Sequence, residues 1–192
     1  MGKAFSRLFG TEEKKSPNDE PKNEETVDVT PPTKEEETVT EEPKGDGSQY
    51  AKDMLTKHNE KRALHSTAAM TLSVKLCEDA QKWADHIAAK NALEHCKDRE
   101  GAGENLAWSS AELGADAAVD MWYNELKDYD FSQPGFSGST GHFTQVVWKA
   151  STEFGAGFAQ ASDGSTYVVG RYLPPGNMNM AGQFEENVLP LA

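Results

Sequence analysis

Residues 11–48 contain no Phe, Trp, Tyr, Leu, Ile or Met. They hold thirteen Asp or Glu and five Lys, so their net charge is 5 − 13 = −8, and EETV occurs in them twice. A segment of this composition cannot bury enough apolar surface to offset the entropy lost on ordering. We therefore predict that residues 11–48 form a disordered acidic linker.

The whole chain also lacks a basic stripe, a long apolar run and a glycosylation sequon. Its net charge is −13, which argues against nucleic acid as a partner. No run of about 20 apolar residues occurs, so no membrane-spanning helix is expected. Lys3 is followed by no apolar segment of the length that a secretory signal needs. These absences predict an intracellular protein that is not secreted.

Cysteine is scarce, since Cys77 and Cys96 are the only two. They flank a predicted helix, and nineteen residues at about 1.5 Å per residue would separate them by more than about 20 Å. A disulfide needs Cα atoms within about 7 Å. We therefore expect both thiols to stay reduced.

The first ten residues match an acylation pattern. In MGKAFS, Gly2 is the candidate myristoylation site and a serine occupies the diagnostic position. One myristoyl chain binds membranes only weakly, so a second signal is required, and basic and apolar neighbours can supply it. The expected membrane contacts are Lys3, Phe5, Arg7, Leu8 and Phe9. We predict that residues 1–10 are a membrane anchor; the alternative is a start of the chain whose apolar residues have no role.

Residues 49–192 have the periodicity of a folded domain. Apolar spacing predicts helices at 49–65, 73–93 and 115–126, and strands at 143–149, 154–160 and 166–173. The first and last of these strands carry large apolar groups on both faces and need cover on both sides. Because the helices mostly precede the strands and the strand connections are short, we predict an α+β fold. The expected form is a three-layer α-β-α sandwich with a mainly antiparallel central sheet.

Four ionisable residues stand in apolar or glycine-rich surroundings: His95 in ALEHC, Glu104 in GENLAW, Glu125 on the predicted helix 115–126, and His142 in GHFTQVVWKAS. Two imidazoles and two carboxylates suit a divalent metal ion, or a hydrogen-bonded cluster around water. Spacing alone leaves both alternatives open, because a lone buried His or Glu is usually a satisfied structural group.

The motif GHFTQVVWKAS at 141–151 resembles the first signature of the CAP superfamily, which comprises cysteine-rich secretory proteins, antigen 5 and pathogenesis-related 1 proteins. HNEKR at 58, GENLAW at 103 and YVVGRYLPPGNM at 167 resemble its other blocks, in the same order. The acylation pattern, WYNELKDYDFSQPGF, ASDGS and FEENVLP look like the intracellular Golgi-associated pathogenesis-related branch. The resemblance covers residues 49–192.

This resemblance implies a three-layer sandwich with an open cleft. The four residues that match the family's tetrad are His95, Glu104, Glu125 and His142, which implies that they hold Zn²⁺ or another divalent ion, with no organic cofactor. Secreted members have a cysteine where Gly170 stands here, and its loss agrees with a reducing compartment. The acidic linker departs from the branch, whose members pass almost directly from the acylated glycine to the domain.

Three functions follow from the sequence. We favour a membrane-anchored binding protein on the cytoplasmic face of the Golgi or other endomembranes, which contacts anionic membrane lipids and a lipid, sterol or protein ligand; the resemblance also implies a weak homodimer. The alternative is a metal-assisted or serine-type hydrolase with Glu104 or Glu125 as general base. Ser109 and Ser110 lie near Glu104 in the sequence, but no G-x-S-x-G motif supports them as nucleophiles. The third function is structural, with the four residues as a buried polar cluster.

Overall fold

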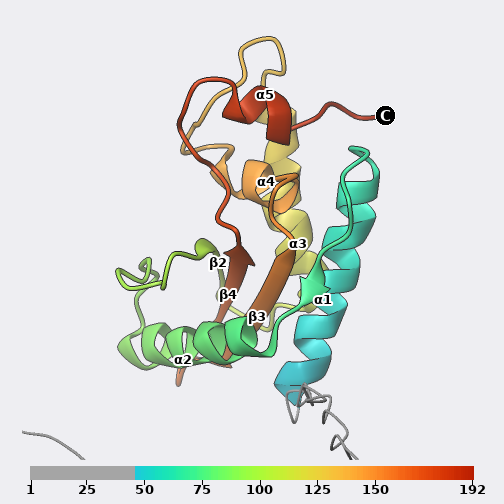
Figure 1. Cartoon of the computed structure of the whole chain (residues 1–192). Coiled ribbons are helices and arrows are strands. Elements are labelled where there is room, and N and C mark those ends of the chain that lie inside the picture. Colours follow the sequence, from blue (N-terminus) through green and yellow to red (C-terminus); the bar gives the residue numbers. More distant parts are fainter. Residues whose placement is uncertain (1–45) are drawn as a thin grey trace, which may run out of the picture. The chain divides into compact units, whose positions relative to one another are not determined.

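The computed structural model describes residues 46–192 (Figure 1). The predicted anchor and nearly all of the predicted linker lie outside these residues. The elements are α1 (Asp46–Ala63), β1 (Thr71–Leu72), α2 (Val74–Lys90), β2 (Gly103–Ser109), α3 (Ala115–Tyr123), η1 (Asn124–Asp128), α4 (Gly141–Val146), β3 (Glu153–Gln160), β4 (Thr166–Leu173) and α5 (Gln183–Asn187). None of the helices in residues 46–192 combines the length and the apolar content that crossing a bilayer requires.

The sheet has the strand order β1-β3-β4-β2. β4 pairs antiparallel with both β2 and β3, and only the two-residue β1 pairs in parallel, with β3. Helix α2 packs across β3 and β4, while α1 and α3 pack on each other and on the remaining side of the sheet (Figure 1). The predicted α+β class and the three-layer sandwich with a mainly antiparallel sheet are confirmed.

Each face of β4 belongs to a different apolar cluster. Val168 and Tyr172 pack with α1 and α3, whereas Tyr167 and Val169 pack with α2. Successive side chains of a strand point to opposite faces, so a strand covered on both sides needs apolar residues at nearly every position. The two-sided pattern in the sequence therefore correctly predicted that this strand is covered on both faces.

Helix α2 lies directly on the backbone of β3. A Cβ atom added to Gly155 would lie 2.4 Å from the backbone nitrogen of Cys77, and one added to Gly157 would lie 2.4 Å from Cα of Gln81. Any larger residue at these two positions would push the helix off the sheet. Gln81 also donates a hydrogen bond from Nε2 to the carbonyl of Phe158 at 2.8 Å, which holds α2 in this position.

The predicted strand at 143–149 is wrong, because residues 141–146 form α4. Distant ionised side chains satisfy the backbone at both ends of this short helix. Glu125 accepts the N–H groups of His142 and Phe143 at 2.9 and 3.1 Å, and Arg62 donates to the carbonyl of Val146 at 3.1 Å. A run rich in β-branched and aromatic residues favours a strand locally, but these tertiary contacts select the helix.

The converse error concerns residues 103–109, which the sequence pattern did not assign and which form the edge strand β2. Leu106 on this strand has its carbonyl capped by Nε1 of Trp122 at 2.8 Å, so a side chain of α3 takes the place of a further strand. The predicted third helix also ends earlier than expected, and Glu125 lies in the 3₁₀ turn η1 that follows it.

Candidate functional site

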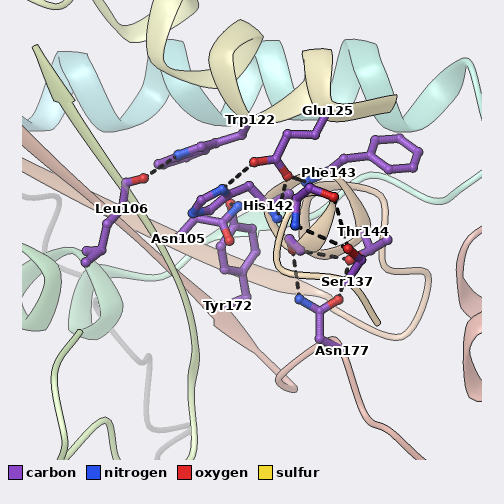
Figure 2. Close-up of polar contacts among 12 residues, drawn as sticks. Asn105, Leu106, Trp122, Glu125, Ser137, His142, Phe143, Thr144, Tyr172 and Asn177 are labelled. Carbon is purple, nitrogen blue, oxygen red and sulfur yellow. Dashed lines mark hydrogen bonds and ion pairs between the residues drawn. The ribbon is translucent and has the colours of Figure 1, made fainter. Parts of the chain in front are cut away.

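A cleft of about 720 Å³ opens between the loop after α2, the start of α4 and the loop after β4. Three of the four residues predicted from the sequence, His95, Glu104 and His142, line it. Glu125 is not part of its lining but contacts His142 (Figure 2). The structure therefore brings His95 and His142, which are 47 positions apart in the sequence, to one cleft.

His142 is held by Glu125 at two of its atoms (Figure 2). Nδ1 of His142 donates to Oε1 of Glu125 at 2.6 Å, and the backbone N–H of His142 donates to Oε2 at 2.9 Å. A proton on Nδ1 leaves Nε2 of the neutral ring as a free lone pair. The imidazole remains 34% exposed, so Nε2 can bind a ligand from the cleft.

His95 makes the matching pair with Glu104. Oε1 of Glu104 accepts Nδ1 of His95 at 2.6 Å and the backbone N–H of Cys96 at 3.1 Å. The Glu104 side chain is fully buried, while His95 is 58% exposed. The buried carboxylate thus orients a solvent-exposed imidazole.

Arg171 supplies the counter-ion of Glu104, and the sequence analysis missed it. Its Nη2 lies 3.2 Å from Oε2 of Glu104, close enough for an ion pair although the alignment is not that of a hydrogen bond. The two residues are direct cross-strand partners of β4 and β2. An arginine inside a two-sided apolar strand is an unusual signal that something buried needs a positive charge.

Strand β2 supports both histidines from its two faces. Consecutive residues of a strand point to opposite sides, so Glu104 faces His95 while Asn105 faces α4. Nδ2 of Asn105 donates to the backbone carbonyl of His142 at 3.1 Å (Figure 2). The dipeptide in the GENLAW block therefore positions both halves of the site.

The loop after β4 fastens the start of α4. Asn177 has a positive φ of 57°, and its Nδ2 donates to the carbonyl of Gly141 at 2.8 Å. Its Oδ1 accepts the hydroxyl of Thr144 at 2.6 Å (Figure 2). These two contacts fix the turn of chain from which His142 projects.

The mouth of the cleft is both apolar and charged. Phe136 and Met178, which line it, are 56% and 40% exposed, and Met180 in the same loop is 60% exposed. Lys97 and Arg99 also line the cleft. The lining of the cleft thus combines exposed apolar side chains with basic ones.

The four predicted residues form two His–Glu pairs instead of one four-ligand cage. In residues 46–192, no group of three or more His, Cys, Asp or Glu side chains is arranged to hold a metal ion. A metal-binding histidine commonly donates its second ring N–H to a carboxylate, and both histidines of the cleft do so. Each His–Glu pair therefore has the arrangement that a metal-bound histidine commonly has.

A three-layer sandwich whose cleft carries two His–Glu pairs defines a class of protein. The chain belongs to the CAP family, the cysteine-rich secretory protein family, whose model matches residues 55–172.

Among individual proteins, the chain is 44% identical over 149 residues to human Golgi-associated plant pathogenesis-related protein 1. The matched region is 77% of this chain and 97% of that protein. It is 42% identical over 145 residues to protein PRY2 of Saccharomyces cerevisiae. Here the matched region is 74% of this chain and 42% of that protein.

Solved structures share the fold. NaASP2 with Zn²⁺ superposes with a TM-score of 0.59 at 23% identity, over 77% of this chain and 87% of that one. BmVAL-1 gives a TM-score of 0.60 at 21% identity, over 75% of this chain and 83% of that one.

Proposed function

We propose that this CAP-domain protein is a membrane-anchored binding protein on the cytoplasmic face of the Golgi or other endomembranes, whose cleft holds a divalent metal ion. The paired geometry of His95 and His142 carries the metal proposal, because each Nδ1 is bound to a glutamate and each Nε2 remains available. Zn²⁺ is the first candidate, since it accepts imidazole nitrogen readily. One solved structure of this fold, NaASP2, was obtained with Zn²⁺.

In this proposal the histidines are the metal ligands and the glutamates orient them. A metal bound there would act as a Lewis acid and hold water or a ligand oxygen in its open positions. Glu104 and Glu125 keep each imidazole in the tautomer that has Nε2 free. The charge of Arg171 balances that of Glu104.

Replacement of His142 by alanine is expected to lower the affinity for Zn²⁺ by at least about tenfold, because one of two protein nitrogens is lost. Calorimetric titration of the full-length protein with Zn²⁺ alone measures this. His86→Ala is the matched control, since His86 is 53% exposed on α2 and lies outside the cleft lining. Equal affinities for the wild type and both variants would place the metal elsewhere.

The apolar mouth of the cleft supports a lipid or sterol ligand, or an apolar segment of a protein partner. Phe136→Ser is expected to weaken binding of a fluorescent sterol about three- to tenfold, since part of an aromatic side chain's burial is lost. Leu191→Ser is the control, because Leu191 is 57% exposed and does not line the cleft. Sterol affinity that neither substitution changes would contradict a sterol site at Phe136.

The membrane anchor rests on the Gly2 acylation pattern and on the name of the Golgi-associated relative. Gly2→Ala is expected to move the protein from the membrane fraction to the cytosol. Lys3→Glu combined with Arg7→Glu should weaken binding of acylated protein to anionic vesicles but not to zwitterionic ones. Unacylated protein that sediments with anionic vesicles as well as the acylated form does would contradict the acylation proposal.

The serine-type form of the hydrolase alternative gains no supporting contact from Ser109. Ser109 stands at the opposite end of β2 from Glu104, about 17 Å along the strand at about 3.3 Å per residue. Its hydroxyl accepts the N–H of Ala111 at 3.2 Å, and neither cleft histidine contacts it. We therefore propose binding as the function.

A further inference from the structure

His58 is a buried histidine whose hydrogen bonds have a fixed direction. It is fully buried on α1, and its Nδ1 lies 2.7 Å from the carbonyl oxygen of Met54. A carbonyl can only accept, so Nδ1 carries the ring proton. Nε2 of the neutral ring must therefore accept a hydrogen bond, and the hydroxyl of Tyr172 lies 2.8 Å from it.

The hydroxyl of Tyr172 also contacts Asn105, and the direction of this hydrogen bond is fixed as well (Figure 2). Because the hydroxyl proton points at His58, the hydroxyl oxygen is available as an acceptor. Nδ2 of Asn105 donates to it at 3.2 Å. The hydroxyl thus acts as both donor and acceptor, in a buried region where an unpaired polar group costs free energy.

Asn105 in turn orients the backbone of His142. Its Nδ2 has two hydrogens, and the second partner is the carbonyl of His142 at 3.1 Å. Rotation of the amide by 180° would place Oδ1 against two oxygens that need a donor, the carbonyl of His142 and the hydroxyl of Tyr172. Both contacts therefore fix which way the amide points. The chain of contacts runs from α1 through β4 and β2 to α4.

His142 is consequently held at three atoms. Glu125 takes the ring Nδ1 and the backbone N–H, and Asn105 takes the backbone carbonyl. We infer that the buried chain His58–Tyr172–Asn105 is a positioning device that sets the place of His142 in the cleft, and that Tyr172 and Asn105 are positioning residues for ligand binding there. The ligand-binding part of this inference rests on the proposed function; the positioning part does not.

Amide hydrogen exchange on the metal-free, full-length protein tests the positioning. Tyr172→Phe removes one hydroxyl, and we expect the amides of His142 and Phe143 to exchange about three- to tenfold faster, the effect of about one lost hydrogen bond. Tyr167→Phe is the matched control on the same strand, because its hydroxyl donates to Asn91 on the α2 side. The exchange of Val169 in the sheet reports any general loss of stability.

Asn105→Ala is an independent test, because it removes the hydrogen bonds to Tyr172 and to the carbonyl of His142 and leaves the pair His58–Tyr172 intact. It should accelerate exchange at His142 more than Tyr172→Phe does. If, relative to Val169, neither variant changes the exchange of His142 and Phe143 more than Tyr167→Phe does, the inference is wrong.

Titration with Zn²⁺ separates this inference from the proposed function. We expect Tyr172→Phe and Asn105→Ala to weaken binding about three- to tenfold, with Tyr167→Phe unchanged. A wild-type protein that binds no Zn²⁺ would overturn the metal proposal, while faster exchange at His142 in the variants would still establish the positioning. Unchanged Zn²⁺ affinity in both variants of a protein that binds the metal would overturn the ligand-binding part.

Discussion

Arg62→Met is expected to cost about 4–8 kcal/mol and to leave the domain unfolded at 37 °C. Arg62 is 1% exposed, and its guanidinium donates to four backbone carbonyls: those of Ala68, Val146, Trp148 and Ser151, at 2.9, 3.1, 2.8 and 2.8 Å. Each carbonyl left unpaired costs about 1–3 kcal/mol, and the stability of a domain is about 5–15 kcal/mol.

Two further substitutions make this prediction specific. Arg62→Lys keeps the positive charge but has three donors on one nitrogen, so it should retain only part of the stability. Arg99→Met, at the exposed rim of the cleft, should change the free energy of unfolding by less than about 0.5 kcal/mol. Urea unfolding measures all three. An unfolding free energy of Arg62→Met within about 1 kcal/mol of the wild type would contradict the structural role assigned to this residue.

Acid should destabilise the domain through His58 before the carboxylates dominate. Burial lowers the pKa of His58 from 6.5 to about 3, with a smaller contribution in the same direction from the charge of Arg62. Between these two values the unfolded chain binds a proton that the folded protein does not, so stability falls as the pH falls from 6.5 toward 3. The loss reaches roughly 4–5 kcal/mol at about 1.4 kcal/mol per pH unit.

His58→Gln removes this titration and isolates it from every other acidic effect. The variant is expected to be less stable than the wild type at pH 7, because the bonds to Met54 and Tyr172 are perturbed. Its stability should fall less steeply than that of the wild type between pH 6.5 and 4.5, by roughly 2–3 kcal/mol in total. His86→Gln, at an exposed site, is the control. Urea unfolding at several pH values measures this. If the unfolding free energies of the wild type and His58→Gln fall equally steeply with pH, His58 does not carry the effect.

The helix and strand assignments show where local pattern suffices. The two-sided pattern of residues 166–173 predicted a strand covered on both faces, and the apolar spacing of residues 73–93 predicted α2. Both elements are selected mainly by the burial of their own side chains. Residues 141–146 have a comparable apolar run, yet they form a helix whose ends are satisfied by Glu125 and Arg62. No local pattern contains that information, because both partners lie far away in the sequence.

The sequence by itself determined the family and the layered α+β fold, because short motifs and apolar periodicity are local. It also singled out His95, Glu104, Glu125 and His142, which the structure arranges as two His–Glu pairs. Only the tertiary structure decided how these residues are used. The cross-strand register of β2 and β4 puts Arg171 beside Glu104, and the alternation of β2 puts Asn105 under His142. Register and facing depend on which strands pair. That pairing is settled by packing the two apolar clusters and by satisfying buried polar groups across the whole domain.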